Sequence, residues 1–189
     1  MEPGKLLELM DLGERMKNNT RHSFTSAGRR ESVAEHSWRL ALMAYFVKDE
    51  FPGADMDRVM RMCLFHDMGE AFTGDIPAFE KTGEHEAQEK RQVEAWLESL
   101  PQPYKEELGE LFSEMEKRQT LESKIYKALD KLEALIQHNE AALSTWLPLE
   151  YDLQLTYGER DVEFSSYMKE LRRLVNEESV RKMGKQGKF

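Results

Sequence analysis

The sequence is poor in the features that mark secreted, membrane-spanning and nucleic-acid-binding proteins. Its 189 residues include a single cysteine, Cys63, so no disulfide can form within the chain, which fits a reducing compartment. The longest uninterrupted apolar run, residues 40–47, falls far short of the ~20 residues that a membrane-spanning helix needs. The net charge of -9 argues against duplex nucleic acid as the main partner, because phosphate backbones attract an excess of Lys and Arg.

The N-terminal segment also lacks a basic start followed by an apolar stretch. Glu2, Glu8 and Asp11 lie among its leucines, so it does not resemble a secretory signal. We therefore expect a cytoplasmic protein with no nucleic acid polymer and no membrane as its partner. A small anionic substrate is compatible with the acidic composition, because such a ligand needs only a few local cationic groups and a metal.

Runs of alternating β-branched residues are absent, whereas apolar residues recur every three or four positions. This periodicity predicts an all-α protein, with helices near residues 4–17, 33–51, 55–68, 84–100, 103–118, 122–146 and 160–177. Ser32 followed by Glu35 forms a capping-box pattern that starts the second of these helices. We expect one domain over residues 1–189, which ends in a basic tail at residues 181–189.

One polar stretch, residues 18–31, has no clear period and lies just before a predicted helix N-terminus. It contains Arg21 and His22, and we expect a ligand-binding loop there. Two other conspicuous side chains have ordinary explanations. His138 lies in polar surroundings and is expected to be exposed, whereas Trp38 is expected to pack.

Ionisable side chains occupy three places where helical spacing predicts a buried apolar face. His66, Asp67 and Glu70 continue the inward face of the third predicted helix. His36 continues an apolar stripe of the second helix, and Asp130 is flanked by leucines and an isoleucine on a later one. Because a buried ionised group costs several kcal/mol unless it has a partner, these side chains require a cation or a set of donors.

Each of these residues also has a simpler explanation when it is taken alone. His36 fits a hydrogen-bonded core histidine, Asp130 a surface acid, and the pair at residues 66–67 an ordinary helix end. Together, however, two imidazoles and two carboxylates form a ligand set suited to a first-row divalent ion with positions left open. We therefore predict a site for one divalent metal ion, which can be Mn, Co, Ni, Fe, Zn or Mg, made by His36, His66, Asp67 and Asp130.

Three ordered motifs carry a resemblance to a known family. They are VAEHS at residues 33–37, HDMGEA followed by GDIP at residues 66–77, and KALDKL at residues 127–132. The chain resembles the HD-domain metal-dependent phosphohydrolases, and within them it is most similar to the small 5′-deoxynucleotidases. The match covers a metal-binding core near residues 5–145. It implies a single-domain HD-domain helical bundle that forms a homodimer.

The resemblance also implies roles for individual residues. The metal ligands would be His36, His66, Asp67 and Asp130. The catalytic residues would be Glu70, which helps to activate the attacking water, and Asp67. The substrate contacts would be Arg21, His22, Asp75, Ile76 and Pro77. Arg21 matches a phosphate-orienting arginine and Asp75 a sugar contact, whereas the tryptophan that usually follows this arginine, and that helps to select deoxyribose, is replaced by His22.

The resulting functional hypothesis is hydrolysis of (deoxy)nucleoside 5′-monophosphates by attack of metal-bound water, which releases the nucleoside and inorganic phosphate. One alternative is an HD-family hydrolase of another nucleotide, an alarmone or a cyclic dinucleotide. Cyclic-dinucleotide enzymes usually have Lys where this chain has Glu70. A second alternative is a non-catalytic, metal-containing nucleotide-binding module, in which Glu70 and Arg21 would be dispensable.

Overall fold

The computed structural model describes residues 1–184. The α-helices are α1 (Pro3–Asn18), α2 (Val33–Phe46), α3 (Met56–Phe65), α4 (Glu70–Thr73), α5 (Gly83–Glu98), α6 (Tyr104–Lys117), α7 (Leu121–Glu140), α8 (Glu150–Thr156) and α9 (Ser166–Gly184). Short 3-10 helices are η1 (Lys48–Glu50), η2 (Leu143–Thr145) and η3 (Arg160–Val162). Two strands, β1 (Thr20–Phe24) and β2 (Arg30–Ser32), form an antiparallel hairpin. The predicted all-α fold is confirmed, since this hairpin is the only sheet within residues 1–184.

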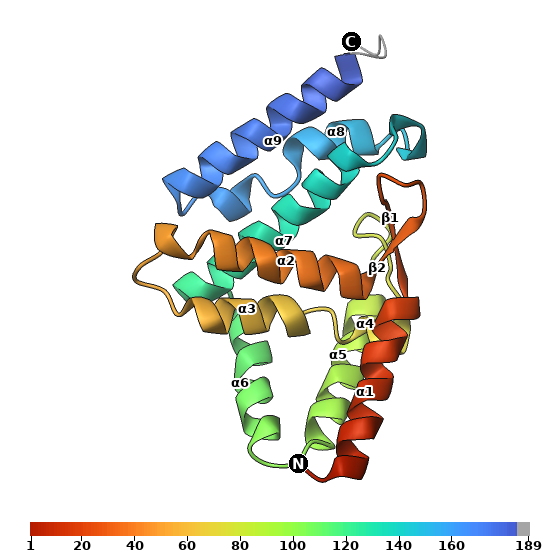
Figure 1. Ribbon diagram of the computed structural model, residues 1–189, viewed down its shortest axis with the longest axis vertical. Helices are drawn as coiled ribbons and strands as arrows, with labels where there is room; N and C mark the ends of the chain where they lie inside the picture. The colour runs from red at the N-terminus through yellow and green to blue at the C-terminus, as the bar shows by residue number, and fades with distance from the viewer. Residues whose placement is uncertain (185–189) are drawn as a thin grey trace.

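Helix α7 is the centre of the molecule. It contacts α2, α3, α6, α9 and strand β1, and it passes diagonally behind the antiparallel pair α2 and α3 (Figure 1). Its inward positions Ile125, Leu129 and Leu132 are at most 1% exposed, and they meet Leu40 of α2 and Val59 of α3 in one core. Each such side chain contributes about 1.5–3 kcal/mol when it is fully buried. The functional residues of α2, α3 and α7 are therefore held on a rigid base.

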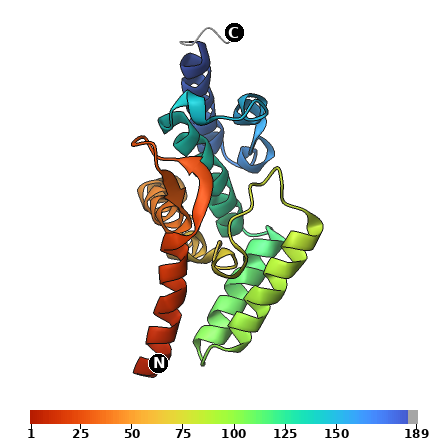
Figure 2. The same ribbon diagram turned by 90° about the vertical axis from the view of Figure 1, so that its right-hand side faces the viewer.

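Helices α1, α5 and α6 extend away from this centre as roughly parallel rods (Figure 2). A second apolar cluster, built around Leu12, Trp96 and Leu100, fills the space between them. Gly69 lies where α5 approaches the segment between α3 and α4. A Cβ atom there would lie 2.6 Å from Cγ of Glu89 and 3.0 Å from a methyl carbon of Val93, so a larger residue would force these side chains to shift.

Several predicted helices are shorter or interrupted in the structure. The helix predicted at residues 33–51 starts at the capping box as expected but ends at Phe46, where the chain tightens into η1. The helix predicted near residues 55–68 is α3, which ends at Phe65, within the uncertainty of the predicted helix ends, and a turn follows it. The C-terminal helix runs over residues 166–184 instead of 160–177, so part of the expected basic tail is helical. The rest of that tail, residues 185–189, lies outside the described residues.

The sequence prediction missed the β1–β2 hairpin and the two short helices α4 and α8 altogether. The polar stretch at residues 18–31 is the β1–β2 hairpin, and its strands are too short and too polar for an alternating pattern to predict them. Helix α8 has only 7 residues, which is less than the length over which helical periodicity is readable.

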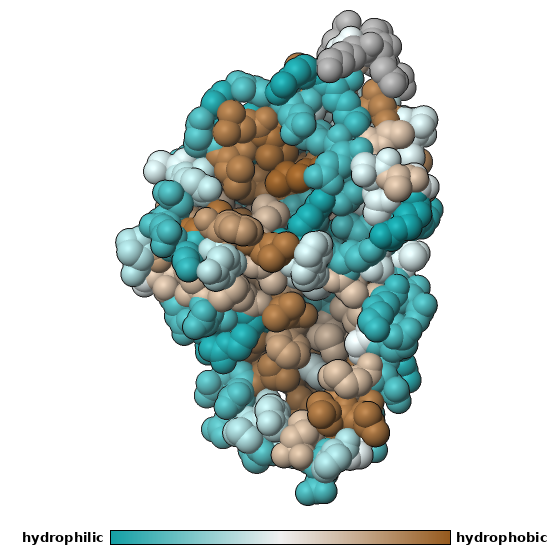
Figure 3. Space-filling model, in the orientation of Figure 1, coloured by the Kyte–Doolittle hydropathy of each residue, from teal (hydrophilic) through white to brown (hydrophobic). Residues whose placement is uncertain are grey.

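The outer face of α2 carries exposed apolar side chains. The prediction that Trp38 packs was wrong, because its side chain is 60% exposed, and Leu42, Tyr45 and Phe46 follow it on the same helix with exposures of 38–77%. Apolar surface is visible in the upper, middle and lower parts of this face of the molecule (Figure 3). No helix in the described part of the chain is long and apolar enough to cross a membrane.

Candidate active site

Four side chains from three separated segments converge beside α7. His36 lies in the first turns of α2, whose start is fixed by the Ser32–Glu35 capping box. His66 caps the C-terminus of α3, and Asp67 follows it in the turn toward α4. Asp130 lies midway along α7. Three segments that are distant in the sequence therefore supply these four side chains.

The four side chains of His36, His66, Asp67 and Asp130 form a quartet in which the distances between polar atoms are short. Nε2 of His36 lies 3.3 Å from Nε2 of His66 and 3.3 Å from Oδ1 of Asp130. Nε2 of His66 lies 3.0 Å from Oδ2 of Asp67 and 3.7 Å from Oδ1 of Asp130. His36, His66 and Asp67 satisfy by themselves the spacing that one metal ion requires. The sequence prediction that these four residues are neighbours therefore agrees with the geometry.

In both histidines the Nδ1 atom, which faces away from the quartet, has a hydrogen-bond partner. Nδ1 of His66 donates to the carbonyl oxygen of Cys63 at 2.9 Å, and Nδ1 of His36 bonds to a carboxylate oxygen of Glu133. With the proton on Nδ1, each Nε2 directs a lone pair at the centre of the quartet. Two lone pairs and two carboxylates that face one another require a cation between them, which is a further proton on His36 in the metal-free protein and can be replaced by a metal ion. This donor set fits a divalent metal ion, in which second partners commonly fix the ligand tautomer.

The charged groups around the quartet also favour a bound cation. Burial and Arg21 lower the pKa of His36, but Glu133 and Asp130 more than offset them and raise it to about 9. Burial raises the pKa of Asp130, yet Lys127 and the two imidazoles hold it well below its usual range. The ammonium of Lys127 lies 2.6 Å from Oδ2 of Asp130. The charge of the site is thus negative enough to attract cations. Lys127, the first residue of the KALDKL motif, compensates part of this charge.

Glu70 lies at the start of α4, one turn beyond Asp67. Its side chain is buried, and Oε2 has no hydrogen-bond partner among the described residues. Burial raises the pKa of Glu70 to about 10, and the nearby carboxylates of Asp67 and Asp75 add to this effect. The amide of Asn19 donates to the backbone carbonyl of Glu70 at 2.6 Å and ties this turn to α1. An unpartnered carboxyl group beside the quartet is suited to exchange protons with a bound molecule.

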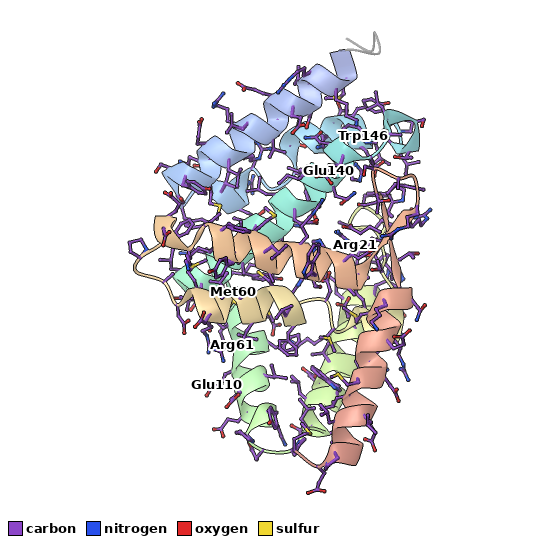
Figure 4. The ribbon with its side chains drawn as sticks, viewed as in Figure 1. Arg21, Met60, Arg61, Glu110, Glu140 and Trp146 are labelled. Atoms are coloured by element: carbon purple, nitrogen blue, oxygen red, sulfur yellow. The ribbon has the colours of Figure 1, made fainter. Side chains whose placement is uncertain are left out.

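A buried ionic network lies on the far side of His36. Glu133 is fully buried, accepts from Nε of Arg39 at 2.6 Å, and lies 3.3 Å from Arg21. Arg21, on the hairpin (Figure 4), also bonds to Glu31 at 2.9 Å. Sequence reasoning missed both glutamates. Glu133 follows the third motif directly, one helical turn after Asp130, so the rule that selected Asp130 could also have selected it.

A cavity of about 220 Å³ is lined by Arg21 and by Ala134, one helical turn after Asp130, although no residue of the quartet itself lines it. Four of the predicted substrate contacts line it, namely Arg21, His22, Asp75 and Pro77. Ile76 lies in the same loop but is not among the lining residues, and its role stays a prediction. Sequence reasoning did not select Glu150 or His138 as residues of the cavity. The prediction that His138 is exposed was wrong, because its side chain is only 16% exposed.

Comparison with known proteins places this arrangement in a family. The family model described as an HD domain matches residues 13–172, which is most of the chain. The chain belongs to the HD-domain family. The predicted resemblance is confirmed, and the helical bundle described above is the fold of an HD domain.

Individual relatives are similar over comparable lengths. A human 5′-deoxynucleotidase, HDDC2, is 34% identical over 140 residues, which cover 71% of this chain and 67% of the human protein. A 5′-deoxynucleotidase of Schizosaccharomyces pombe is 29% identical over 140 residues, or 70% of each chain. The crystal structure of a predicted metal-dependent phosphohydrolase from Magnetospirillum magnetotacticum is 27% identical, with a TM-score of 0.77 over 94% of each chain. These matches identify the HD-domain chain as a hydrolase and imply a divalent metal.

Proposed function

We propose that the chain hydrolyses nucleoside 5′-monophosphates, with the 2′-deoxy forms as preferred substrates, to nucleoside and inorganic phosphate. The observation that carries the proposal is the convergence of two imidazoles and two carboxylates beside a cavity lined by Arg21 and Asp75. The names of the human and yeast relatives, both 5′-deoxynucleotidases, support this substrate class.

We further propose that one divalent ion is held by His36, His66, Asp67 and Asp130. When bound, such an ion neutralises phosphoryl oxygens and makes water acidic enough to act as a nucleophile near pH 7. Manganese and cobalt are the first ions to test, because mixed imidazole and carboxylate ligands suit the divalent ions of the first transition row.

The side chains of the protein supply orientation and proton transfer. Arg21 is fixed by Glu31 and Glu133, which leaves other guanidinium N–H groups to bind the phosphate from the cavity side. Glu70, protonated by its raised pKa, can pass a proton to the leaving 5′ oxygen, and its pKa would be lowered by a divalent ion bound at the quartet, so that it could accept one from the attacking water. Asp75 accepts from the sugar hydroxyl, and the backbone N–H of His22 helps to position its carboxylate.

The direct test measures phosphate release from a panel of deoxynucleotides and ribonucleotides after chelation and after re-addition of manganese or cobalt. We expect turnover only in the metal-replete samples, and the Asp67→Ala variant should be inactive and metal-poor. The panel includes a guanosine polyphosphate and a cyclic dinucleotide. Faster hydrolysis of either would replace this proposal, and tight nucleotide binding without any turnover would indicate a binding module.

We also propose that the chain is a single domain that acts as a cytoplasmic homodimer. The exposed apolar face of α2, with Trp38 and Phe46 at its two ends, is a surface that a second copy could cover. Sedimentation velocity of the purified protein tests this assembly. A Phe46→Glu variant should sediment as a monomer, and a wild-type monomer at micromolar concentration would refute the proposal.

A further inference from the structure

The cavity beside the quartet extends along α7 away from Asp130. Asp130, Ala134 and His138 follow one another at four-residue intervals on one face of this helix, and the last two line the cavity. A rise of 1.5 Å per residue separates Asp130 and His138 by roughly 12 Å along the axis. A phosphate held near Asp130 and Arg21 therefore directs the rest of a mononucleotide toward His138.

The far end of the cavity contains a cluster of three polar side chains. Oε1 of Glu150, at the start of α8, lies 3.1 Å from Nε2 of His22 and 3.6 Å from Nε2 of His138. Nε2 of His22 is a buried atom that makes no hydrogen bond within the described residues. Burial lowers the pKa of His138, so this imidazole is neutral near pH 7.

The position of Glu150 is fixed independently of the two imidazoles. Its second oxygen, Oε2, accepts from the backbone N–H of Leu147 at 2.6 Å, and its side chain is only 5% exposed. Glu150 lines the cavity, and Oε1 has lone pairs to spare, since a carboxylate can accept about four hydrogen bonds. Apolar groups, among them Phe79 and Leu153, make up most of the cavity lining.

The size of the cavity limits what can occupy it. Its 220 Å³ is below the roughly 300–1,000 Å³ of pockets that enclose whole drug-sized ligands. Arg21 and Asp75, the proposed phosphate and sugar contacts, line part of this cavity, so the space left beside His138 and Glu150 suits a flat heterocyclic base. Phe79 is 37% exposed, and its ring makes an edge contact with His22 at 5.7 Å between ring centroids. It offers an aromatic surface on which a base can stack.

We propose that His22, His138 and Glu150 form a nucleobase subsite in which Glu150 accepts a hydrogen bond from an exocyclic amino group. Cytosine provides such a donor, whereas uracil places a carbonyl oxygen at the equivalent ring position, where it meets the carboxylate oxygen and is repelled. The subsite therefore favours amino-bearing bases over uracil and thymine. This inference rests on the proposed function, because it assigns the base specificity of the same substrate.

The test compares two pairs of compounds that differ only at this ring position. The first pair is dCMP and dUMP, for which kcat/KM is measured with manganese. The second pair is 2′-deoxycytidine and 2′-deoxyuridine, whose binding is measured by calorimetry without any need for turnover. A hydrogen bond to a charged group changes such ratios by about 10- to 100-fold. We expect wild-type preference for the cytosine member of both pairs.

Three variants separate recognition of the base from general effects. Glu150→Gln replaces the acceptor with an amide that can donate to a carbonyl oxygen, so the cytosine-to-uracil ratio should fall about tenfold or more. Asp152→Asn removes the same charge from an exposed position of α8 and should leave the ratio unchanged. Phe79→Ala should raise KM for both nucleotides to the same extent. Thermal unfolding verifies that each variant is folded.

The possible results distinguish this inference from the proposed function. If the wild type and the Glu150→Gln variant hydrolysed the nucleotides with the same cytosine-to-uracil ratio of kcat/KM, the base subsite would be overturned and the proposed phosphohydrolase activity would stand. Absence of hydrolysis combined with selective binding of 2′-deoxycytidine, lost in Glu150→Gln, would support the subsite and overturn the proposed reaction. Equal binding of the two nucleosides by the wild type would overturn the subsite, whatever the turnover.

Discussion

Replacement of Glu133 by Gln tests how the protein prepares His36 for a metal. In the wild type, a carboxylate oxygen of Glu133 accepts from Nδ1 of His36, so the lone pair of Nε2 faces the quartet. The other carboxylate oxygen is occupied by Arg39 at 2.6 Å. In the Glu133→Gln variant the single oxygen stays with Arg39, and the amide N–H₂ group faces Nδ1. The imidazole proton then moves to Nε2, where it blocks the metal position.

The expected loss follows from this change of tautomer. Removal of the second partner of a metal-bound histidine typically costs 10–100-fold in metal affinity, which corresponds to about 1.4–2.7 kcal/mol. The assay is competition for manganese or cobalt against a coloured chelator, with kcat measured at saturating metal. We expect the affinity to fall within this range and most of kcat to return when metal is in excess.

Glu140→Gln is a matched control. Glu140 also bonds to Arg39, at 2.6 Å, but it is exposed and has no bond to His36. This variant should bind metal as the wild type does. If a folded Glu133→Gln variant bound metal within twofold of the wild type, the assigned role of Glu133 would be wrong.

Further predictions concern stability. The Gly69→Ala variant places a methyl group against Glu89, so we expect unfolding free energy to fall by about 1–3 kcal/mol in urea titrations, and an unchanged value would refute the close packing of α5. Hydrogen bonds from Arg29 and Ser32 lower the pKa of Glu35 to about 2, so this residue stabilises the fold above about pH 4.5 and loses that effect as the pH falls toward 2. Because Glu35 is 41% exposed, the Glu35→Gln variant should lose no more than about 1 kcal/mol at pH 6 and almost nothing at pH 2, and equal losses would contradict the assignment. Manganese at about 1,000 times its Kd should stabilise the wild type by about 4 kcal/mol in thermal scans, and the absence of this shift in wild type, or its persistence in Asp130→Asn, would contradict the metal site.

The residues of the quartet could be selected from the sequence because each violates a local pattern. His36, His66 and Asp130 stand at helical positions where an apolar side chain would pack with less cost, and such a violation is visible without knowledge of the fold. Glu133 violates the pattern in the same way and was overlooked. Its role became visible only when the hydrogen bond to His36 linked α7 to α2.

The far end of the cavity could not be predicted in this way. Glu150 meets His22 and His138 only because the short helix α8 folds back beside α7 and the hairpin. No local pattern of the sequence encodes that packing, since α8 spans 7 residues and His138 lies among polar neighbours. Long-range packing also decides where α3 ends, and a periodic pattern cannot predict that end to the exact residue.

The most direct test of the metal centre is the metal content of the purified protein, measured by mass spectrometry in wild type and in the Asp130→Asn variant after growth with manganese. We predict close to one divalent ion per wild-type chain and almost none in a variant whose circular dichroism spectrum is unchanged. An equal metal content in the two proteins, or a wild type that holds no divalent ion, would contradict the account.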